Sequence, residues 1–266
     1  MTRKMLFSNP AEITGVIFLA VSSLVFVASP LFAAAIAFFY ILLCVSACFF
    51  PQINFLLPVI SRGQTGKKMV ALTFDDGPAE PTTRQVLDLL DKYSVKAAFF
   101  VSGVNAQRYP EIIKDIVSRG HSIGNHSLSH NPFLMLTSFN NLYREISDAQ
   151  EILRKMGINT RAFRPPAGIV NPKLSPILEK LGMFCVTFSC RAFDAGNLYV
   201  RDIAFKILKK VKDDDIILLH DVPPRRNEDS AALLPEIERL LTGIIAKGLR
   251  IVPLADLINK EVVSNH

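Results

Sequence analysis

The sequence is short of several residue types, and each shortage excludes something. It has no tryptophan, so none of its binding surfaces contains an indole ring. It has only four cysteines in 266 residues and no CxxC pair. This argues against a zinc knuckle and against a disulfide framework, so cysteine usage leaves the cellular compartment open.

Charge is nearly absent from the N-terminal quarter of the chain. Glu12 is the only charged residue between positions 5 and 61, whereas residues from Arg62 onward hold 28 of the 30 basic and 23 of the 24 acidic side chains. This mild, evenly mixed positive excess does not indicate a nucleic-acid partner, and we expect none. It is compatible with a position beside an anionic membrane and equally with an ordinary solvated surface.

In place of charge, the N-terminal quarter has an apolar run from Ile13 to Ile60. One straight helix of this length would extend roughly 70 Å, more than twice the bilayer core of about 30 Å. Ser29-Pro30 is the expected bend, because proline interrupts a helix. We therefore assign residues 1–62 to a membrane anchor with two helices, 13–28 and 31–50.

The flanking charges predict how this anchor is oriented. Arg3 and Lys4 precede it, Arg62 and two lysines follow it, and the turn between the helices is uncharged. Positive charge on both flanks favours a hairpin in the inner membrane of a bacterium, with the rest of the chain on the cytoplasmic face. Two outward-facing readings stay open, namely a signal sequence before a second apolar run, or a single spanning helix.

The remainder, about residues 66–260, alternates strand-like and helix-like segments. This alternation predicts a parallel α/β sheet, and the number of units favours a barrel over an open sheet. We see no internal repeat. The expected strands are 69–74, 96–101, 121–123, 162–164, 183–188, 215–219 and 250–253. The expected helices are 82–93, one that begins at Pro110 and has core positions as far as Val117, 141–156, 172–182, 200–211 and 231–247.

Polar side chains recur where these strands end, which is where parallel α/β folds place their chemistry. They are Asp75-Asp76, His126 and His130, the Pro165–Gly168 stretch, Asp194, and His220-Asp221. Two histidines four residues apart, plus one carboxylate, leave an open position for water on a bound metal. Two adjacent aspartates at a strand end point in different directions, so one can hold a metal while the other takes a proton.

In combination, these segments resemble the NodB-homology polysaccharide deacetylases, carbohydrate esterase family four, across about residues 68–258. The similar segments are Thr73–Gly77 (TFDDG), His126–His130 (HSLSH), Arg164–Gly168 (RPPAG) and Leu218–His220 (LLH). The resemblance implies a distorted (β/α)₇ barrel and a metal-dependent hydrolase that removes the acetyl group from an N-acetylated amino sugar.

The resemblance also implies roles for single residues. Asp75 corresponds to the catalytic base. Asp76, His126 and His130 correspond to the ligands of one divalent metal, for which zinc is expected.

Four further residues complete the implied site. Arg164 corresponds to the arginine that orients the base, and the backbone N–H of Ala167 to an oxyanion donor. His220 corresponds to the general acid and Asp194 to the aspartate that tunes it. By contrast, we expect His121 to be structural and Asp221 to serve a turn or helix cap.

The chain departs from the family pattern around Asp194. The usual tryptophan is absent, Arg191 stands where an acidic residue is common, and Ala167 replaces a frequent aromatic residue. Because few aromatic side chains are expected around the site, the sequence leaves two substrate classes open: a cell-envelope glycan and a polyprenyl-phosphate-linked amino sugar. If the chain is not an enzyme, the alternative is a non-catalytic carbohydrate- or lipid-binding module.

Overall fold

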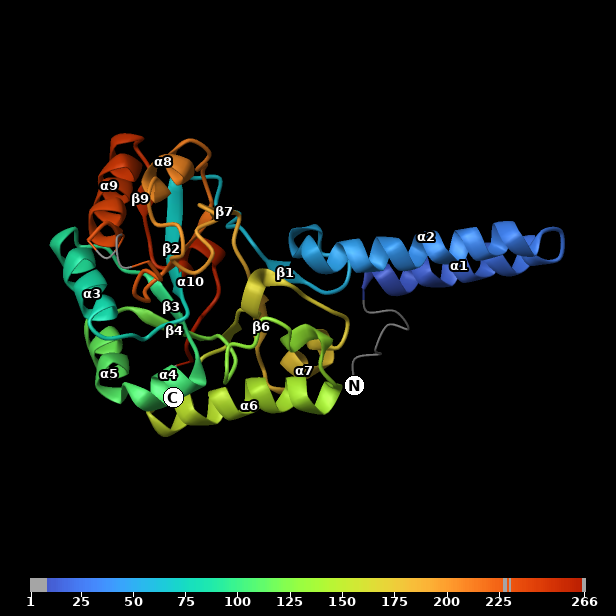
Figure 1. Cartoon of the computed structure of the whole chain (residues 1–266), viewed down its shortest axis with the longest axis horizontal. Coiled ribbons are helices and arrows are strands. Elements are labelled where there is room, and N and C mark those ends of the chain that lie inside the picture. Colours follow the sequence, from blue (N-terminus) through green and yellow to red (C-terminus); the bar gives the residue numbers. More distant parts are fainter. Residues whose placement is uncertain (1–8, 227–228, 230, 265–266) are drawn as a thin grey trace.

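The computed structural model describes residues 9–226, 229 and 231–264. It consists of an α/β domain from which two paired helices project as a rod (Figure 1). Nine strands form the sheet: β1 Val59–Ile60, β2 Met69–Asp75, β3 Ala98–Val101, β4 Ser122–Asn125, β5 Ala162–Phe163, β6 Phe184–Val186, β7 Cys190–Arg191, β8 Ile216–His220 and β9 Arg250–Ile251.

The strands run in the order β1-β6-β5-β4-β3-β2-β8-β7, and β9 pairs with the start of β2. Every strand pair is parallel. Because β1 and β7 do not pair, the sheet is an incomplete, barrel-like structure rather than a closed cylinder. The expected parallel α/β fold is therefore confirmed. The strands β1 and β7 were not predicted, since two-residue strands show no alternation of their own.

Helices connect the strands and cover the sheet. They are α3 Thr82–Lys92, α4 Gly103–Arg108, α5 Pro110–Ser118, α6 Phe139–Lys155, α7 Leu174–Lys180, α8 Ile203–Leu208, α9 Leu233–Ala246 and α10 Leu254–Ile258. α5 begins at its proline as expected, since proline at the first helical position loses no intrahelical hydrogen bond. α6 begins two residues before the predicted start, because the Ser138 side chain accepts a hydrogen bond from Asn141 N at 3.2 Å.

The rod is formed by α1, Pro10–Phe26, and α2, Pro30–Phe49. The predicted helix pair and its bend at Ser29-Pro30 are thus present, with α1 starting earlier because Asn9 caps it. The Tyr40 hydroxyl donates to Ala11 O at 2.8 Å and ties the two helices together. α2 is long and apolar enough to cross a membrane, at about 30 Å, whereas α1 is shorter. Arg3 and Lys4 lie outside the described residues.

Both domain-side ends of the rod are joined to the domain. Val170 N donates to Cys48 O at 3.0 Å, and Ala11 N donates to Phe55 O at 3.1 Å. Ala11 and Ala47 are buried in one apolar cluster with α6, α7 and β6. β1, which follows the rod, pairs with β6. Residues 59–60, which we assigned to the anchor segment, therefore also belong to the sheet.

Candidate active site

The register of the sheet brings the expected polar residues to one edge. At the end of β2, Asp75 lies opposite Phe100 of β3 and His220 of β8. At the end of β4, Asn125 lies opposite Phe163 of β5. Since all these strands are parallel, the residues that follow them emerge side by side, and the sequence motifs meet in space.

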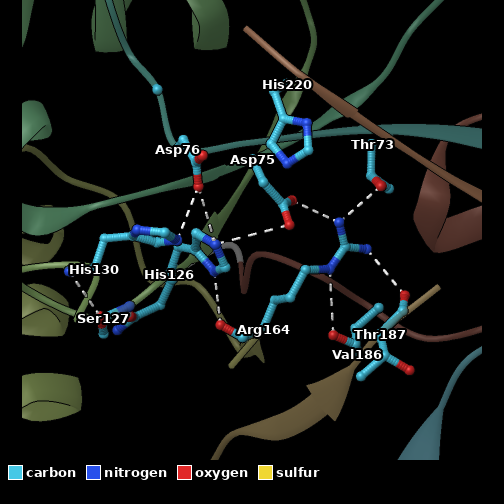
Figure 2. A network of polar contacts seen from close by, with 12 residues as sticks. Thr73, Asp75, Asp76, His126, Ser127, His130, Arg164, Val186, Thr187 and His220 are labelled. Carbon is cyan, nitrogen blue, oxygen red and sulfur yellow. Dashed lines mark hydrogen bonds and ion pairs between the residues drawn. The ribbon is translucent and has the colours of Figure 1, made fainter. Parts of the chain in front are cut away.

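The two aspartates separate at the end of β2. Asp76 has a backbone φ of 77°, which turns the chain sharply after the extended Asp75. The Asp76 carbonyl accepts a hydrogen bond from the Asn105 side chain at 2.8 Å, which supports this strained turn. As a result, both carboxylates lie near His126, but only Asp75 contacts Arg164 and only Asp76 contacts His130 (Figure 2).

Asp76, His126 and His130, the metal ligands expected from the sequence, lie together and could hold a metal ion. Their ligand atoms lie within 4.8 Å of one another. Oδ1 of Asp76 is 2.9 Å from Nε2 of His130 and 3.5 Å from Nε2 of His126. Ligands held 2.0–2.2 Å from a tetrahedral zinc ion stand about 3.3–3.6 Å apart. The Asp76–His126 distance lies in this range and the Asp76–His130 distance is slightly shorter, so the donor set is close to the spacing that such an ion needs.

The surroundings of His126 and Asp76 strengthen this fit. Nδ1 of His126 lies 2.8 Å from the carbonyl oxygen of Arg164. A carbonyl only accepts, so Nδ1 carries the proton and Nε2 is the nitrogen that can bind a metal. Burial raises the pKa of Asp76, but its contacts with the two histidines, which carry a proton on Nε2 when no metal is bound, outweigh burial and hold this pKa well below its ordinary value.

A chain of hydrogen bonds positions His130. The backbone N–H of His130 donates to the Ser127 hydroxyl at 3.2 Å, and the backbone N–H of Ser127 donates to the side-chain oxygen of Asn125 at 2.9 Å. Asn125 is fully buried and is itself held by the carbonyl of Ile146 on α6. The histidine loop is therefore anchored to the sheet and to a helix, which fixes the spacing of the ligands.

Arg164 lies beneath Asp75 and is completely buried. Its Nη1 donates to Oδ1 of Asp75 at 2.6 Å and to the Thr73 hydroxyl at 2.8 Å. Its other nitrogens donate to the carbonyls of Thr187 and Val186. These contacts hold the carboxylate of Asp75 in one orientation, with Oδ2 toward His126 (Figure 2).

His220 and Asp194 form a second acid–base pair. Nδ1 of His220 is 2.6 Å from Oδ2 of Asp194, and the ring lies beside Asp75 and Asp76 (Figure 2). Burial by itself lowers the pKa of His220, but the hydrogen bond and charge of Asp194 prevail and raise it to about 9. Asn197 N donates to Asp194 at 3.2 Å and helps to hold this carboxylate.

These groups line one cavity of about 210 Å³, with Arg164 just below its floor. Ala167 also lines it, with a φ of 58° that is rare for a residue with a Cβ atom. The cavity does contain aromatic walls, Phe188 and Phe193, and the charged Arg191 and Arg225. Sequence reasoning missed the two phenylalanines, because nothing in their local pattern distinguishes them from core residues.

The structure separates the residues assigned to packing from those at the site. His121 is buried in the core, where Nδ1 accepts from Ala97 N at 3.1 Å and the ring packs on Phe99. Asp221 is buried as well and accepts hydrogen bonds from Gly77 N at 3.1 Å and the Thr83 hydroxyl at 2.6 Å. It thus braces the loop after Asp76. All four cysteines are free.

A parallel sheet with acidic and imidazole groups gathered at its carboxyl edge defines a hydrolytic enzyme with an α/β fold. Residues 62–186 match the model of the polysaccharide deacetylase family. The chain is 34% identical over 197 residues to a peptidoglycan-N-acetylglucosamine deacetylase of Bacillus cereus, covering 72% of this chain and 89% of that relative. The chain belongs to the polysaccharide deacetylase family, as its motifs predicted.

Two further comparisons agree with this membership. A chitooligosaccharide deacetylase of Sinorhizobium fredii is 33% identical over 170 residues, covering 63% of this chain and 79% of the relative. The crystal structure of a peptidoglycan N-acetylglucosamine deacetylase bound to an N-oxidanyl-benzamide compound superposes with a TM-score of 0.69 at 28% identity. That alignment covers 77% of this chain and 94% of the other.

Proposed function

We propose that this chain is a metal-dependent hydrolase that removes the acetyl group from an N-acetylated amino sugar. The observation that carries the proposal is the division between the adjacent aspartates. Asp75 is held by Arg164 at 2.6 Å, whereas Asp76 faces His126 and His130. One carboxylate is thereby free to take a proton while the other is committed to a cation, as amide hydrolysis at a metal site requires.

A divalent ion bound by Asp76, His126 and His130 would polarise the acetyl carbonyl and lower the pKa of the attacking water. The nitrogen-rich, three-ligand set favours zinc. Asp75 accepts the proton of the attacking water, and Arg164 holds its carboxylate in position.

Two further groups complete the reaction. The backbone N–H of Ala167 stabilises the oxyanion, for which its turn at positive φ is suited. His220, kept protonated by Asp194, donates a proton to the departing amine. The relatives named as peptidoglycan and chitooligosaccharide deacetylases support an N-acetylated glycan as the substrate class.

The test is acetate release by the full chain in detergent, measured with N-acetylglucosamine oligomers and with lipid-linked N-acetylglucosamine. We expect zinc-dependent turnover that Asp75→Asn reduces at least a hundredfold, the usual contribution of a positioned base. Asp88→Asn is the matched control, because the Asp88 side chain on α3 is 70% exposed and does not line the cavity that contains Asp75. Full activity in Asp75→Asn, or none in the wild type with bound zinc, would reject the assignment. The second outcome would favour a carbohydrate- or lipid-binding module.

We also propose that α1 and α2 anchor the enzyme in the inner membrane as a hairpin. Large apolar side chains such as Leu24, Leu31 and Phe32 are exposed along the rod, at 78%, 80% and 68%. An exposed apolar surface of this extent needs a lipid or protein environment. Both domain-side ends of the rod contact the domain, so a spanning hairpin places the N-terminus and the domain on one face, which the basic flanks assign to the cytoplasm.

Fusions at the C-terminus test this orientation. A fluorescent protein should be bright, and alkaline phosphatase inactive, if the domain is cytoplasmic. The opposite pattern would show that the domain faces outward.

A further inference from the structure

A second cavity, of about 860 Å³, adjoins the catalytic one. The two share a wall made of five residues: Ala167, Gly168, Phe188, Arg191 and Phe193. At its other end the second cavity is lined by Phe49 and Phe50, where α2 leaves the rod. A continuous path therefore leads from the end of the proposed anchor to the proposed oxyanion donor, and we call this second cavity the anchor cleft.

The anchor cleft is lined by three cations, Arg62, Arg191 and Lys210, and by no acidic residue. Arg62 is already engaged, because its guanidinium lies 2.7 Å from the buried carboxylate of Asp215. Within the described part of the chain, no carboxylate lies within ion-pair distance of Arg191 or Lys210. The cleft thus has two positive charges without an ion-pair partner among the described residues, and Asp194 acts on Arg191 only from a longer distance.

Arg191 and Lys210 are gathered around one aromatic ring. The Arg191 guanidinium carbon is 4.2 Å and the Lys210 ammonium 4.8 Å from the ring centre of Phe193, which is 65% exposed. Cation–π contacts hold the two charges near each other without neutralising them. Such an arrangement suits a phosphate, since arginine offers a planar fork of donors and lysine a point charge.

The other end of the cleft is apolar. Phe49, the last residue of α2, and Phe50, which follows it, are 59% and 54% exposed. If the rod is embedded, these rings lie at the membrane surface, beside the cations. The cleft therefore matches a ligand with an anionic group between an apolar tail and a polar head.

We propose that the anchor cleft binds the phosphate of a lipid-linked, N-acetylated amino sugar, a proposal that rests on the function assigned above. The phosphate contacts Arg191 and Lys210, the sugar enters the catalytic cavity past Ala167, and the lipid leaves along Phe49 and Phe50. A neutral glycan polymer would instead bury these two cations without any countercharge. The cleft thus selects a membrane-bound precursor in preference to a finished polymer.

The test compares two probes for binding to the full chain in phosphatidylcholine nanodiscs. One is N-acetylglucosaminyl phosphate with a farnesyl tail, and the other has the same sugar and tail joined by an uncharged ether. We expect the phosphate probe to bind at least tenfold more tightly, as a charge-assisted hydrogen bond contributes. Arg191→Gln and Lys210→Gln should each reduce this preference severalfold, and Arg191→Lys should restore part of it.

Lys206→Gln is the matched control, because it removes the same charge from an exposed position on α8, four residues before Lys210 and outside the cleft. It should leave the preference unchanged. Lys210 is exposed, so its substitution should fold, which circular dichroism can verify. Inorganic phosphate, and nanodiscs of equal parts phosphatidylglycerol and phosphatidylcholine, serve as competitors for the phosphate probe.

Equal affinities for the two probes would overturn the proposal, as would a preference that Lys210→Gln does not change. Competition by inorganic phosphate or phosphatidylglycerol as strong as that of the probe itself would also overturn it. The cleft would then be a general phosphate or headgroup site. Preferential binding of the phosphate probe without acetate release would instead support the cleft and reject the proposed catalytic function.

Discussion

Replacing Arg164 with methionine should destabilise the protein more than the loss of an ordinary side chain. The guanidinium is fully buried, donates to Asp75, Thr73 and two backbone carbonyls, and packs 3.9 Å from the ring centre of Phe100. Without it, the carboxylate of Asp75, which is only 4% exposed, lacks a cation. Removing one partner of a buried ion pair costs about 3–5 kcal/mol, because an uncompensated charge remains.

A double substitution isolates the cause of this destabilisation. Asp75→Asn together with Arg164→Met removes both charges of this pair, so the double variant should be more stable than the sum of the two single effects by about 2 kcal/mol. The two residues are in direct contact at 2.6 Å, and such pairs couple strongly.

Thermal unfolding of the metal-free full chain in detergent measures these effects. The chain has no tryptophan, so circular dichroism at the helix band is the practical signal. For a domain of this size, 1 kcal/mol shifts Tm by about 2–4 °C. Arg164→Met should therefore lower Tm by about 6–20 °C. A shift of only a degree or two, or strictly additive effects in the double variant, would show that the ion pair does not bear on stability as reasoned.

Three further predictions follow from the site and the core. Asp76→Ala should abolish tight zinc binding and the thermal stabilisation that zinc provides, whereas retained stoichiometric zinc by elemental analysis would contradict the ligand assignment. Asp194→Asn should move the alkaline limb of kcat/KM to lower pH. Asp194 raises the pKa of His220 to about 9 against the effect of burial, so its loss deprotonates His220 at lower pH, and an unmoved limb would remove His220 as the acid. Gly124→Ala should lower stability by about 1–3 kcal/mol, because a Cβ would lie 2.4 Å from the buried Phe100 ring; an unchanged Tm would refute this.

The candidate site residues could be predicted because reactive polar side chains directly follow the ends of the expected strands in the sequence. Asp75-Asp76 and the His126–His130 pair are local motifs whose spacing constrains side-chain direction. The structure brings them together with Arg164 and His220 at one edge of the sheet. Parallel pairing alone explains this meeting, since it aligns the carboxyl ends of strands that are distant in sequence.

Other features had no local signal. β1 and β7 are two residues long and are defined only by their partners, β6 and β8. Asp221 reads as a turn residue, yet it is buried and braces Gly77 across 144 positions of sequence. Phe193 resembles any apolar residue, and only the fold exposes its ring between two cations.

The sequence by itself determined the family and its class of chemistry, the presence of an apolar N-terminal segment before an α/β fold, and which three residues we propose as metal ligands. These features depend on residue types and short spacings, which can be seen in the sequence without knowing how the chain folds. Only the tertiary structure decided how the helix pair meets the domain. The backbone N–H of Val170 donates a hydrogen bond to the carbonyl of Cys48, and β1 pairs with β6 in the sheet. The end of α2 lines the anchor cleft, which adjoins the cavity of the candidate site. Those contacts join residues more than a hundred positions apart, and long-range packing of this kind leaves no periodic trace in the sequence.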